Sequence, residues 1–385
     1  TLKPLLYGLA FDKLGYKPYN ILLDMPVTIL TSTNESYRPK NYDLEYWGSL
    51  TARESLACSR NIPAVTLAKK IGFENFYSYL KSIGFDHIQE PPEHYGPGIA
   101  LGTARASLII LARLYAGIAN KGVMLPIYFG KDYKGNAIEI GKKFKIMSEK
   151  SSFQITHILA DRNARRRTFG PRNFLDFPFE VAAKTGTSKD YRDAWTIGFT
   201  NQYVVGAWVG NFSSKPMNQI SGGWGAGRIF HQVMRLLAER SKPKFTYPKY
   251  LIIQKRCRKT GLLPNKTCSI YNELVDSRNH SEKKCKANHG HTNDTSTEDT
   301  IKITSPIHGE TYILDHSLPL AHQEIPLKIL YSARKDKIYS YQINSGQRKI
   351  ISESIDGSLK LLPGTYNIKI FRMNELVEAI EFHVK

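Results

Sequence analysis

Three short stretches of the chain carry residue types that together could transfer an acyl group through a serine. Lys184-Thr185-Gly186-Thr187 closes an apolar run and precedes two segments that alternate like paired strands. Ser59-Arg60-Asn61 supplies a hydroxyl and a carboxamide near the start of a helical pattern. Thr1-Leu2-Lys3 opens the chain, and a serine directly before it would lie one helical turn from Lys3. A lysine at that distance could take the hydroxyl proton of such a serine.

The two lysines must influence each other if this chemistry is to work. Free lysine titrates near pH 10.4, so burial or a nearby cation must lower the pKa of Lys3 before it can accept a proton. Lys184 is the natural second cation. Ser59 would relay a proton between Lys3 and a leaving amine, while Asn61 would hydrogen-bond a substrate amide and orient Lys3.

In Lys184-Thr185-Gly186-Thr187, strand alternation predicts which side chains face the candidate cleft. Lys184 would project toward a cleft and meet a substrate carboxylate, whereas the Thr185 side chain would point the other way. Gly186 would again face the cleft and let a substrate backbone approach. The N–H of Thr187 would suit an oxyanion hole, and its side chain could hydrogen-bond the carboxylate.

Each stretch alone has a simpler explanation. The first could merely start a helix, because Pro4 is tolerated in a first turn. Ser59 and Asn61 could be helix caps, and Lys184-Thr185-Gly186 could be an ordinary strand end. Their order along the chain, and the elements on which they lie, favour the chemical interpretation.

Composition indicates a folded, basic protein. The 385 residues include 54 lysines and arginines against 34 aspartates and glutamates, a formal net charge of +20. Such an excess favours an anionic surrounding such as nucleic acid, anionic lipid or an acidic polymer. Arg165-Arg166-Arg167 is the densest basic run, and we expect it on a solvated loop. No nucleic-acid motif accompanies it, so nucleic-acid binding rests on charge alone.

The sequence contains no pattern typical of a membrane-spanning helix. Leu108 to Ala119 is the most apolar long run, but Arg113 interrupts it and its length suits a buried helix. A signal peptide is also missing. Because the chain begins inside a motif, an anchor could lie upstream in a longer parent protein.

Residues 1–240 predict one α/β unit in which helices cover an antiparallel sheet. Helical patterns occupy residues 1–14, 51–57, 62–71, 73–83, 104–120, 151–159 and 227–239. Strand patterns occupy residues 181–187, 193–199 and 203–210. Thr200-Asn201-Gln202 is short enough for a hairpin loop between the last two.

Three of the four cysteines cluster in a short polar region. Cys257 and Cys268 could form a disulfide, which an oxidising compartment favours and which would contribute about 3 kcal/mol. The alternative is a zinc site that adds Cys285 and His289, although zinc motifs usually pair cysteines two to four residues apart. Cys58 is expected to be a small buried apolar residue beside the candidate site.

The remaining chain predicts a connector and an all-β region. Residues 241–299 form the connector, and its polar end at residues 286–300 is expected to be a mobile linker. Residues 300–385 alternate short strands with turns and fit a small β-sandwich. The strands are expected at residues 301–304, 325–331, 338–343, 365–371 and 376–384.

The context of these motifs resembles the transpeptidase domain of class A penicillin-binding proteins. The likeness rests on residues 179–211 around Lys184-Thr185-Gly186 and on residues 51–65 around Ser59 and Asn61. The cysteine region and the β-rich end resemble the 1C branch of that family. The resemblance covers nearly the whole chain, and residues 1–240 carry it most firmly.

This resemblance implies a serine-type D-Ala–D-Ala transpeptidase that cross-links peptidoglycan stem peptides and is acylated by β-lactams. Lys3 would be the general base, and Ser59 and Asn61 would relay the proton and orient the substrate. The residues that would bind substrate are Lys184, Thr185, Gly186 and Thr187, with the Thr187 N–H in the oxyanion hole. The family assigns the Thr185 side chain to the substrate carboxylate, which conflicts with strand alternation.

Further expectations follow from the family. No cofactor is expected. The parent would carry a glycosyltransferase domain and a membrane helix upstream, and would act on the periplasmic face of the bacterial inner membrane. Other cell-wall synthesis or envelope proteins are possible partners. Residues 300–385 would bind cell-wall polymer or such a partner.

Two departures from the family pattern affect these expectations. The nucleophilic serine is not in the chain, so the chain as given is expected to be unable to acylate. Arg60 occupies the central position of the middle motif, which bears on peptide specificity. A catalytically silent β-lactam- or peptidoglycan-binding module is the alternative. A β-lactamase is less well supported, because no motif supplies a deacylating glutamate.

Overall fold

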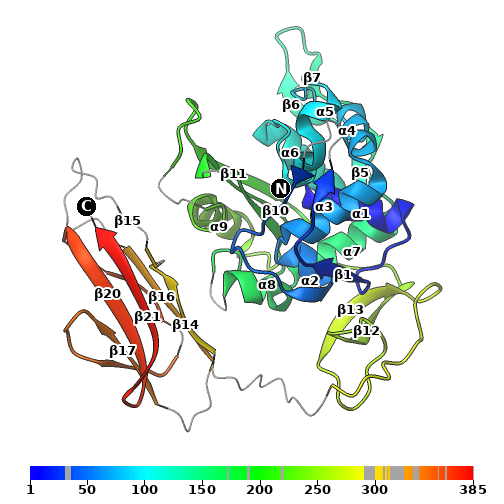
Figure 1. Cartoon of the computed structure of the whole chain (residues 1–385). Helices are drawn as coiled ribbons and strands as arrows, with labels where there is room; N and C mark the ends of the chain where they lie inside the picture. Colours follow the sequence, from blue (N-terminus) through cyan, green and yellow to red (C-terminus); the bar gives the residue numbers. More distant parts are fainter. Residues whose placement is uncertain are drawn as a thin grey trace. The chain divides into compact units, whose positions relative to one another are not determined.

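The computed structural model of the chain describes two compact units, residues 1–288 and residues 289–385 (Figure 1). The described residues are 1–30, 36–170, 173–188, 191–217, 221–289, 300–306, 308–309, 311–312, 325–332, 338–353, 355–359 and 362–384. Most of the linker expected at residues 286–300 therefore lies outside the described residues.

Helices dominate the first unit (Figure 1). In chain order they are α1 (Lys3–Lys13), α2 (Ala52–Ala57), α3 (Asn61–Ile71), α4 (Phe73–Ser82), α5 (Pro92–Tyr95), the 3₁₀ helix η1 (Gly96–Leu101), α6 (Leu108–Ala119), α7 (Glu149–Ala160), α8 (Arg162–Phe169) and α9 (Gly225–Ala238). Among the described residues, no helix has both the length and the apolarity that crossing a bilayer requires.

The strands of the first unit form small sheets around one larger sheet. They are β1 (Ile21–Asp24), β2 (Ile29–Leu30), β3 (Ser36–Tyr37), β4 (Gly48–Thr51), β5 (Val123–Met124), β6 (Ile127–Lys131), β7 (Ala137–Ile140), β8 (Phe144–Lys145), β9 (Ala182–Thr187), β10 (Asp193–Phe199), β11 (Val204–Gly210), β12 (Leu251–Cys257) and β13 (Ile270–Asp276). In the described part of the chain, β11, β10 and β9 lie side by side as an antiparallel sheet.

Helices pack on both faces of this sheet, as strand alternation dictates. Ala183 and Ala194 belong to a core shared with Phe230 of α9. Ala182 and Ile197 belong to the main core, which includes the buried residues of α1, α3 and α6. The predicted antiparallel sheet covered by helices is therefore confirmed.

Helix α1 passes through the centre of the first unit. Pro4 occupies its first turn, where a proline costs no hydrogen bond, and every residue from Lys3 to Phe11 is buried. A helix that is buried all round needs no polar face. The consequence is that Lys3 enters the interior at the N-terminal end of a helix.

The junction between α2 and α3 places Ser59. The Thr51 hydroxyl accepts a hydrogen bond from the Glu54 N–H at 3.1 Å, which caps the start of α2 as the sequence predicts. After Ala57 the chain turns through Ser59, whose φ of +59° is left-handed. A non-glycine residue in that region stores strain of about 1–3 kcal/mol, which surrounding contacts must hold.

The polar connector of the sequence analysis contains a hairpin that is part of the first unit. Strands β12 and β13 pair antiparallel, with Cys257 opposite Ile270. Position 261 in its turn must be glycine, because φ is +69° and a Cβ would lie 1.8 Å from the Tyr19 carbonyl oxygen. The sequence did not predict this hairpin, because basic residues interrupt the apolar alternation of its first strand.

The second unit is all-β, as predicted for residues 300–385. Its strands are β14 (Thr300–Ser305), β15 (Thr311–Tyr312), β16 (Ile325–Ser332), β17 (Tyr339–Ile343), β18 (Lys349–Ile351), β19 (Ile355–Leu359), β20 (Gly364–Arg372) and β21 (Glu375–Val384). They form one sheet in the order β14-β16-β19 and another in the order β15-β21-β20-β17-β18. Buried residues of both sheets, including Leu327 and Phe382, share one core.

One expectation about the basic run is wrong. Arg165 does not lie on a solvated loop, because it belongs to α8 and is only 3% exposed. Its guanidinium donates to the carbonyl oxygens of Leu159 and Leu175 at 2.6 and 2.9 Å. The side chain therefore ties the end of α7 to the segment that leads into β9.

Candidate active site

Four of the predicted site residues meet around the hydroxyl of Ser59. The Nζ atom of Lys184 donates to Ser59 Oγ at 2.7 Å, and Lys3 Nζ lies 3.3 Å from the same oxygen. Lys3 Nζ also donates to Asn61 Oδ1 at 2.6 Å and to the Ser59 carbonyl at 2.5 Å. The contributing elements are α1, the α2–α3 junction, the first turn of α3, and β9.

Both lysines are buried, and their partners are neutral oxygens. Lys3 is 7% and Lys184 2% exposed. Besides Ser59 and Asn61, the contacts include the Thr185 carbonyl, which accepts from Lys184 at 2.9 Å. Among the described residues, no aspartate or glutamate forms a salt bridge with either lysine. The two ammonium groups have therefore lost water without gaining a salt-bridge partner, and Asp24, whose charge favours the protonated form of Lys3, is itself paired with Arg60.

This environment lowers the pKa of both lysines. Burial lowers the pKa of Lys3 well below its usual value, and the charges of Lys184 and Arg60 lower it further. Burial lowers the pKa of Lys184 to about 7. The positive end of the α1 macrodipole also disfavours charge on Lys3. A neutral Lys3 beside a protonated Lys184 is therefore accessible near pH 7.

Thr1 lies against β9 at Gly186. A Cβ on residue 186 would lie 2.9 Å from Thr1 Cγ2 and 3.1 Å from the Thr1 nitrogen, so only glycine allows this approach. Tyr115 of α6 fixes the same end of the chain, because its hydroxyl donates to the Thr1 carbonyl at 2.8 Å. The start of α1 is thereby held beside the Lys3, Ser59 and Lys184 cluster.

The two threonines of β9 differ in what they can offer a substrate. Thr185 is buried, and the cluster uses its carbonyl oxygen. Thr187 lies at the strand end, where its Oγ1 accepts a hydrogen bond from the Gly222 N–H at 2.9 Å. That bond uses a lone pair of Thr187 and leaves its hydroxyl proton able to donate.

Comparison with known proteins identifies the family. The family model described as the penicillin binding protein transpeptidase domain matches residues 1–235. The chain belongs to this family.

Curated relatives agree with the family match. The chain is 31% identical over 243 residues to penicillin-binding protein 1C of Escherichia coli, covering 63% of this chain and 29% of that protein. It is 30% identical over 246 residues to penicillin-binding protein 1A of Rickettsia typhi, covering 56% of this chain and 30% of that one. The chain thus spans less than a third of the length of these curated relatives.

Solved structures share the fold of this penicillin-binding transpeptidase domain. The crystal structure of penicillin-binding protein 1A from Haemophilus influenzae has a TM-score of 0.56 at 20% identity, covering 72% of this chain and 47% of that chain. The penicillin-binding protein PonA1 from Mycobacterium tuberculosis has a TM-score of 0.52 at 20% identity, covering 64% and 70% respectively. At these identities the likeness concerns the fold.

In this transpeptidase domain, Arg60 holds the Ser59-Arg60-Asn61 segment in place through salt bridges and a ring contact. Its guanidinium forms salt bridges to Asp24 at 2.8 Å and to Asp43 at 2.6 Å, and it stacks on the Trp47 ring at 4.0 Å. Arg167 lies over the same ring at 3.7 Å. Arg60 is thus committed to these partners, and it acts on Lys3 through its charge.

Sequence reasoning missed several residues that position the site. Asn41 bridges two of its parts, because its Nδ2 donates to Asp24 at 2.7 Å and its Oδ1 accepts from the Asn61 N–H at 2.8 Å. Asn61 also donates its side-chain amide to the Lys40 carbonyl at 2.7 Å. Nothing in the local pattern marks these residues, since their partners are distant in sequence.

The structure does not contain the expected Cys257–Cys268 disulfide. None of the four cysteines, all of them described, forms a disulfide bond. Cys257 and Cys268 instead lie with Cys285 and His289 in one cluster. Cys58 is buried beside the site, as expected, and its thiol donates to the Ala164 carbonyl at 3.2 Å.

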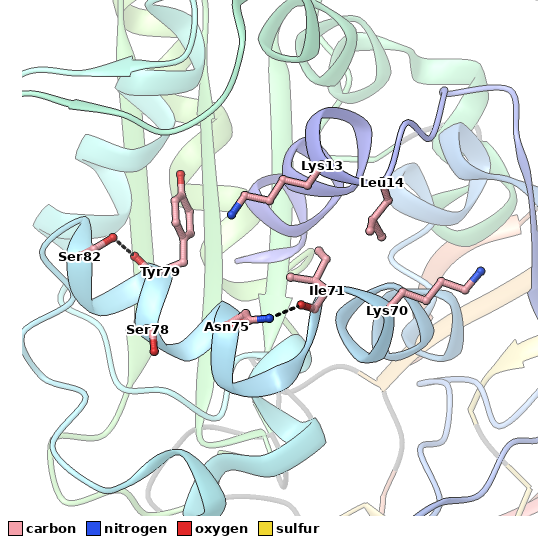
Figure 2. A pocket seen from close by; sticks show the side chains of 8 residues that line it. All are labelled: Lys13, Leu14, Lys70, Ile71, Asn75, Ser78, Tyr79 and Ser82. Carbon is pink, nitrogen blue, oxygen red and sulfur yellow. Dashed lines mark hydrogen bonds between the residues drawn. The ribbon is translucent and has the colours of Figure 1, made fainter.

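A hollow on the first unit lies away from this chemistry. It has a volume of about 510 Å³ and is bordered by the end of α1, by α3 and by α4 (Figure 2). Lys13 lies ten residues after Lys3, about 15 Å along the helix. Asn75 of α4 donates to the Ile71 carbonyl at the end of α3, and Ser82 donates to the Tyr79 carbonyl within α4, as Figure 2 shows. None of the residues that line the hollow belongs to the cluster around Ser59.

Proposed function

We propose that this chain is the D,D-transpeptidase part of a longer protein in which a serine directly precedes Thr1. The observation that carries the proposal is the convergence of two buried, unpaired lysines on the hydroxyl of Ser59, beside the start of α1. The serine would attack the D-Ala–D-Ala carbonyl of a peptidoglycan stem peptide and release D-alanine. An amine of a second stem peptide would then take the acyl group.

The proton path follows the contacts of Lys3. In the neutral state, Lys3 would accept the hydroxyl proton of the nucleophile as its oxygen bonds to the carbonyl carbon. Ser59 Oγ lies within reach of Lys3 and could pass that proton to the leaving nitrogen of D-alanine. Asn61 and the Ser59 carbonyl would keep Lys3 oriented throughout.

Substrate would bind along the free edge of β9. In the described sheet β9 pairs with β10 on one side, so its other edge can pair with an extended peptide. Lys184, while protonated, and the hydroxyl of Thr187 would bind the terminal carboxylate. The N–H of Thr187 and that of the nucleophile would stabilise the oxyanion. β-Lactams would occupy the same place and acylate the serine.

The longer protein would act at the periplasmic face of the bacterial inner membrane. A membrane anchor and a glycosyltransferase domain would precede this chain, and cell-wall or envelope proteins are possible partners. No cofactor is needed, because Lys3, Ser59 and the strand edge account for each proton and charge. A chain that starts at Thr1 lacks the nucleophilic hydroxyl and is expected not to acylate.

A fluorescent penicillin tests the proposal. Two proteins would be compared, one with serine and one with alanine directly before Thr1, each preceded by the same short leader. We expect a stable covalent adduct, visible after denaturing electrophoresis, with the serine protein alone.

Two results would change the conclusion. A folded serine protein without an adduct would reject the acyl-serine mechanism. An adduct without transfer from a D-Ala–D-Ala donor peptide to an acceptor amine would instead support a catalytically silent binding module.

A further inference from the structure

Four metal-binding side chains meet at the loop end of the β12–β13 hairpin. The sulfur atoms of Cys257, Cys268 and Cys285 and a ring nitrogen of His289 all lie within 4.8 Å of one another. Zn–S bonds of about 2.3 Å in a tetrahedron place sulfurs about 3.8 Å apart. The cluster therefore has the dimensions of a four-ligand zinc site. Cys257 and Cys285 are buried, and the other two ligands are half-buried.

Backbone hydrogen bonds hold two of these cysteines side by side. The Cys257 N–H donates to the Leu262 carbonyl and the Cys285 N–H to the Leu263 carbonyl, both at 2.8 Å. Two successive residues of the hairpin turn thus fix the backbone of two ligands. Such a framework sets their positions without a covalent bond between them.

Asn265 connects the remaining parts of the cluster. Its backbone N–H points at Cys268 Sγ, with the nitrogen 3.3 Å from the sulfur. Its side-chain amide donates to the carbonyls of Cys285 and Ala287, each at 2.9 Å. Links of this kind to ligand-bearing segments orient metal ligands.

The charge around the cluster suits an anionic metal centre. Three thiolates, one imidazole and Zn²⁺ carry a net charge of −1. Basic residues flank Cys257 and Cys285 on both sides and lie two positions before Cys268: Arg256, Arg258, Lys284, Lys286 and Lys266. These basic residues, which are neighbours of the ligands in sequence, can offset part of that negative charge.

We infer that Cys257, Cys268, Cys285 and His289 bind one zinc ion. Thiolates and an imidazole suit zinc better than magnesium or calcium, which take oxygen ligands. Four protein ligands leave no open position, so the site would be structural and not catalytic. It would hold together the end of the hairpin that packs on Tyr19 through Gly261.

Zinc content of the full chain tests this inference. The protein would be purified under reducing conditions without chelator, given one equivalent of Zn²⁺ and dialysed, and its zinc measured by plasma mass spectrometry. We expect about one zinc per chain. Cys285→Ser and His289→Ala should lose it, while the matched variants Cys58→Ser and His280→Ala should retain it. Asn265→Ala should weaken zinc binding about 10- to 100-fold.

A second measurement uses the unaltered chain, so it does not depend on whether a variant folds. Titration with a mercurial reagent in the presence of a zinc-sensitive dye should release the zinc as three thiols react. Zinc retained equally by the ligand variants and the wild type would overturn the inference. So would a reduced wild-type protein that takes up no zinc, or one whose isolated form carries a Cys257–Cys268 disulfide and still binds none after reduction.

Discussion

Two buried cationic sites in the described part of the first unit differ in the groups that surround the charge. At the candidate active site, Lys3 and Lys184 contact neutral oxygens. At the foot of the β12–β13 hairpin, Arg53 is 2% exposed but lies between carboxylates. Its guanidinium donates to both oxygens of Glu273 at 2.8 and 2.6 Å and to Asp161 at 2.9 Å.

Whether the pKa of a buried basic side chain is raised or lowered depends on the groups that contact it. Glu273 and Asp161 outweigh burial and raise the pKa of Arg53 above its usual value. Near Lys184, burial dominates and brings the pKa to about 7. A guanidinium also holds its proton far more firmly than an ammonium group. The paired arginine therefore supports structure, whereas the unpaired lysines can exchange protons.

The largest effect expected from this contrast is on Lys3. In the protein with a serine before Thr1, Lys3→Ala should slow acylation by penicillin by about 10²- to 10⁴-fold, because the general base is lost. Stopped-flow or quenched fluorescence labelling measures the rate. Lys3→Arg serves as the control for charge and should be equally slow, since arginine stays protonated. An arginine variant that acylates at the wild-type rate would contradict the assignment.

The second prediction concerns the paired cluster. Arg53→Met should lower the free energy of unfolding by about 3–5 kcal/mol, because it leaves the Glu273 carboxylate buried without its partner. Urea unfolding followed by tryptophan fluorescence measures this. The double variant Arg53→Met/Glu273→Leu should regain most of the loss. If the double variant is no more stable than the single one, the pairing is not what stabilises the hairpin contact.

The third prediction is the pH dependence of acylation, expressed as kcat/KM. Lys3 acts when neutral, so the rate should fall as acid protonates it. Lys184 binds the carboxylate when charged, so the rate should also fall as pH rises through about 7. A bell-shaped profile is expected, with its basic limb near pH 7 and its acidic limb at lower pH, where Lys3 becomes protonated. A rate that keeps rising above neutral pH would show that the charge of Lys184 is not required.

The smallest expected effect is at the end of β9. Thr187→Val removes the acceptor of the Gly222 N–H and the donor to a substrate carboxylate. One hydrogen bond contributes about 1 kcal/mol, so kcat/KM should fall about fivefold. Thr187→Ser keeps the hydroxyl and should retain most of the activity. Equal rates for the valine and serine variants would mean that the hydroxyl contacts no substrate.

The sequence indicated which residues meet around Ser59, but not the contacts that hold them in place. Lys3, Ser59, Asn61 and Lys184 could be found because each lies in a short motif on a recognisable element. The antiparallel sheet followed from the alternation of its strands. These are local signals, and residues close in sequence carry them.

Contacts between distant segments could not be predicted from one chain. The orientation of Arg60 depends on Asp24 and Trp47, and the hairpin is held by a salt bridge over 220 residues of sequence between Arg53 and Glu273. Arg165 was expected in solvent because three arginines in a row are usually exposed. Its burial depends on two backbone carbonyls that only the folded chain brings within reach.

The close approach of α1 to β9 leaves no tolerance for even one methyl group. A side chain at position 186 would overlap Thr1, as the 2.9 Å separation from its Cγ2 indicates. Alanine at position 186 would push Thr1 away from β9, although its methyl group would contact neither the Lys3 amine nor the Lys184 amine. A residue that has no functional group thus helps to set the spacing between Lys3 and Lys184.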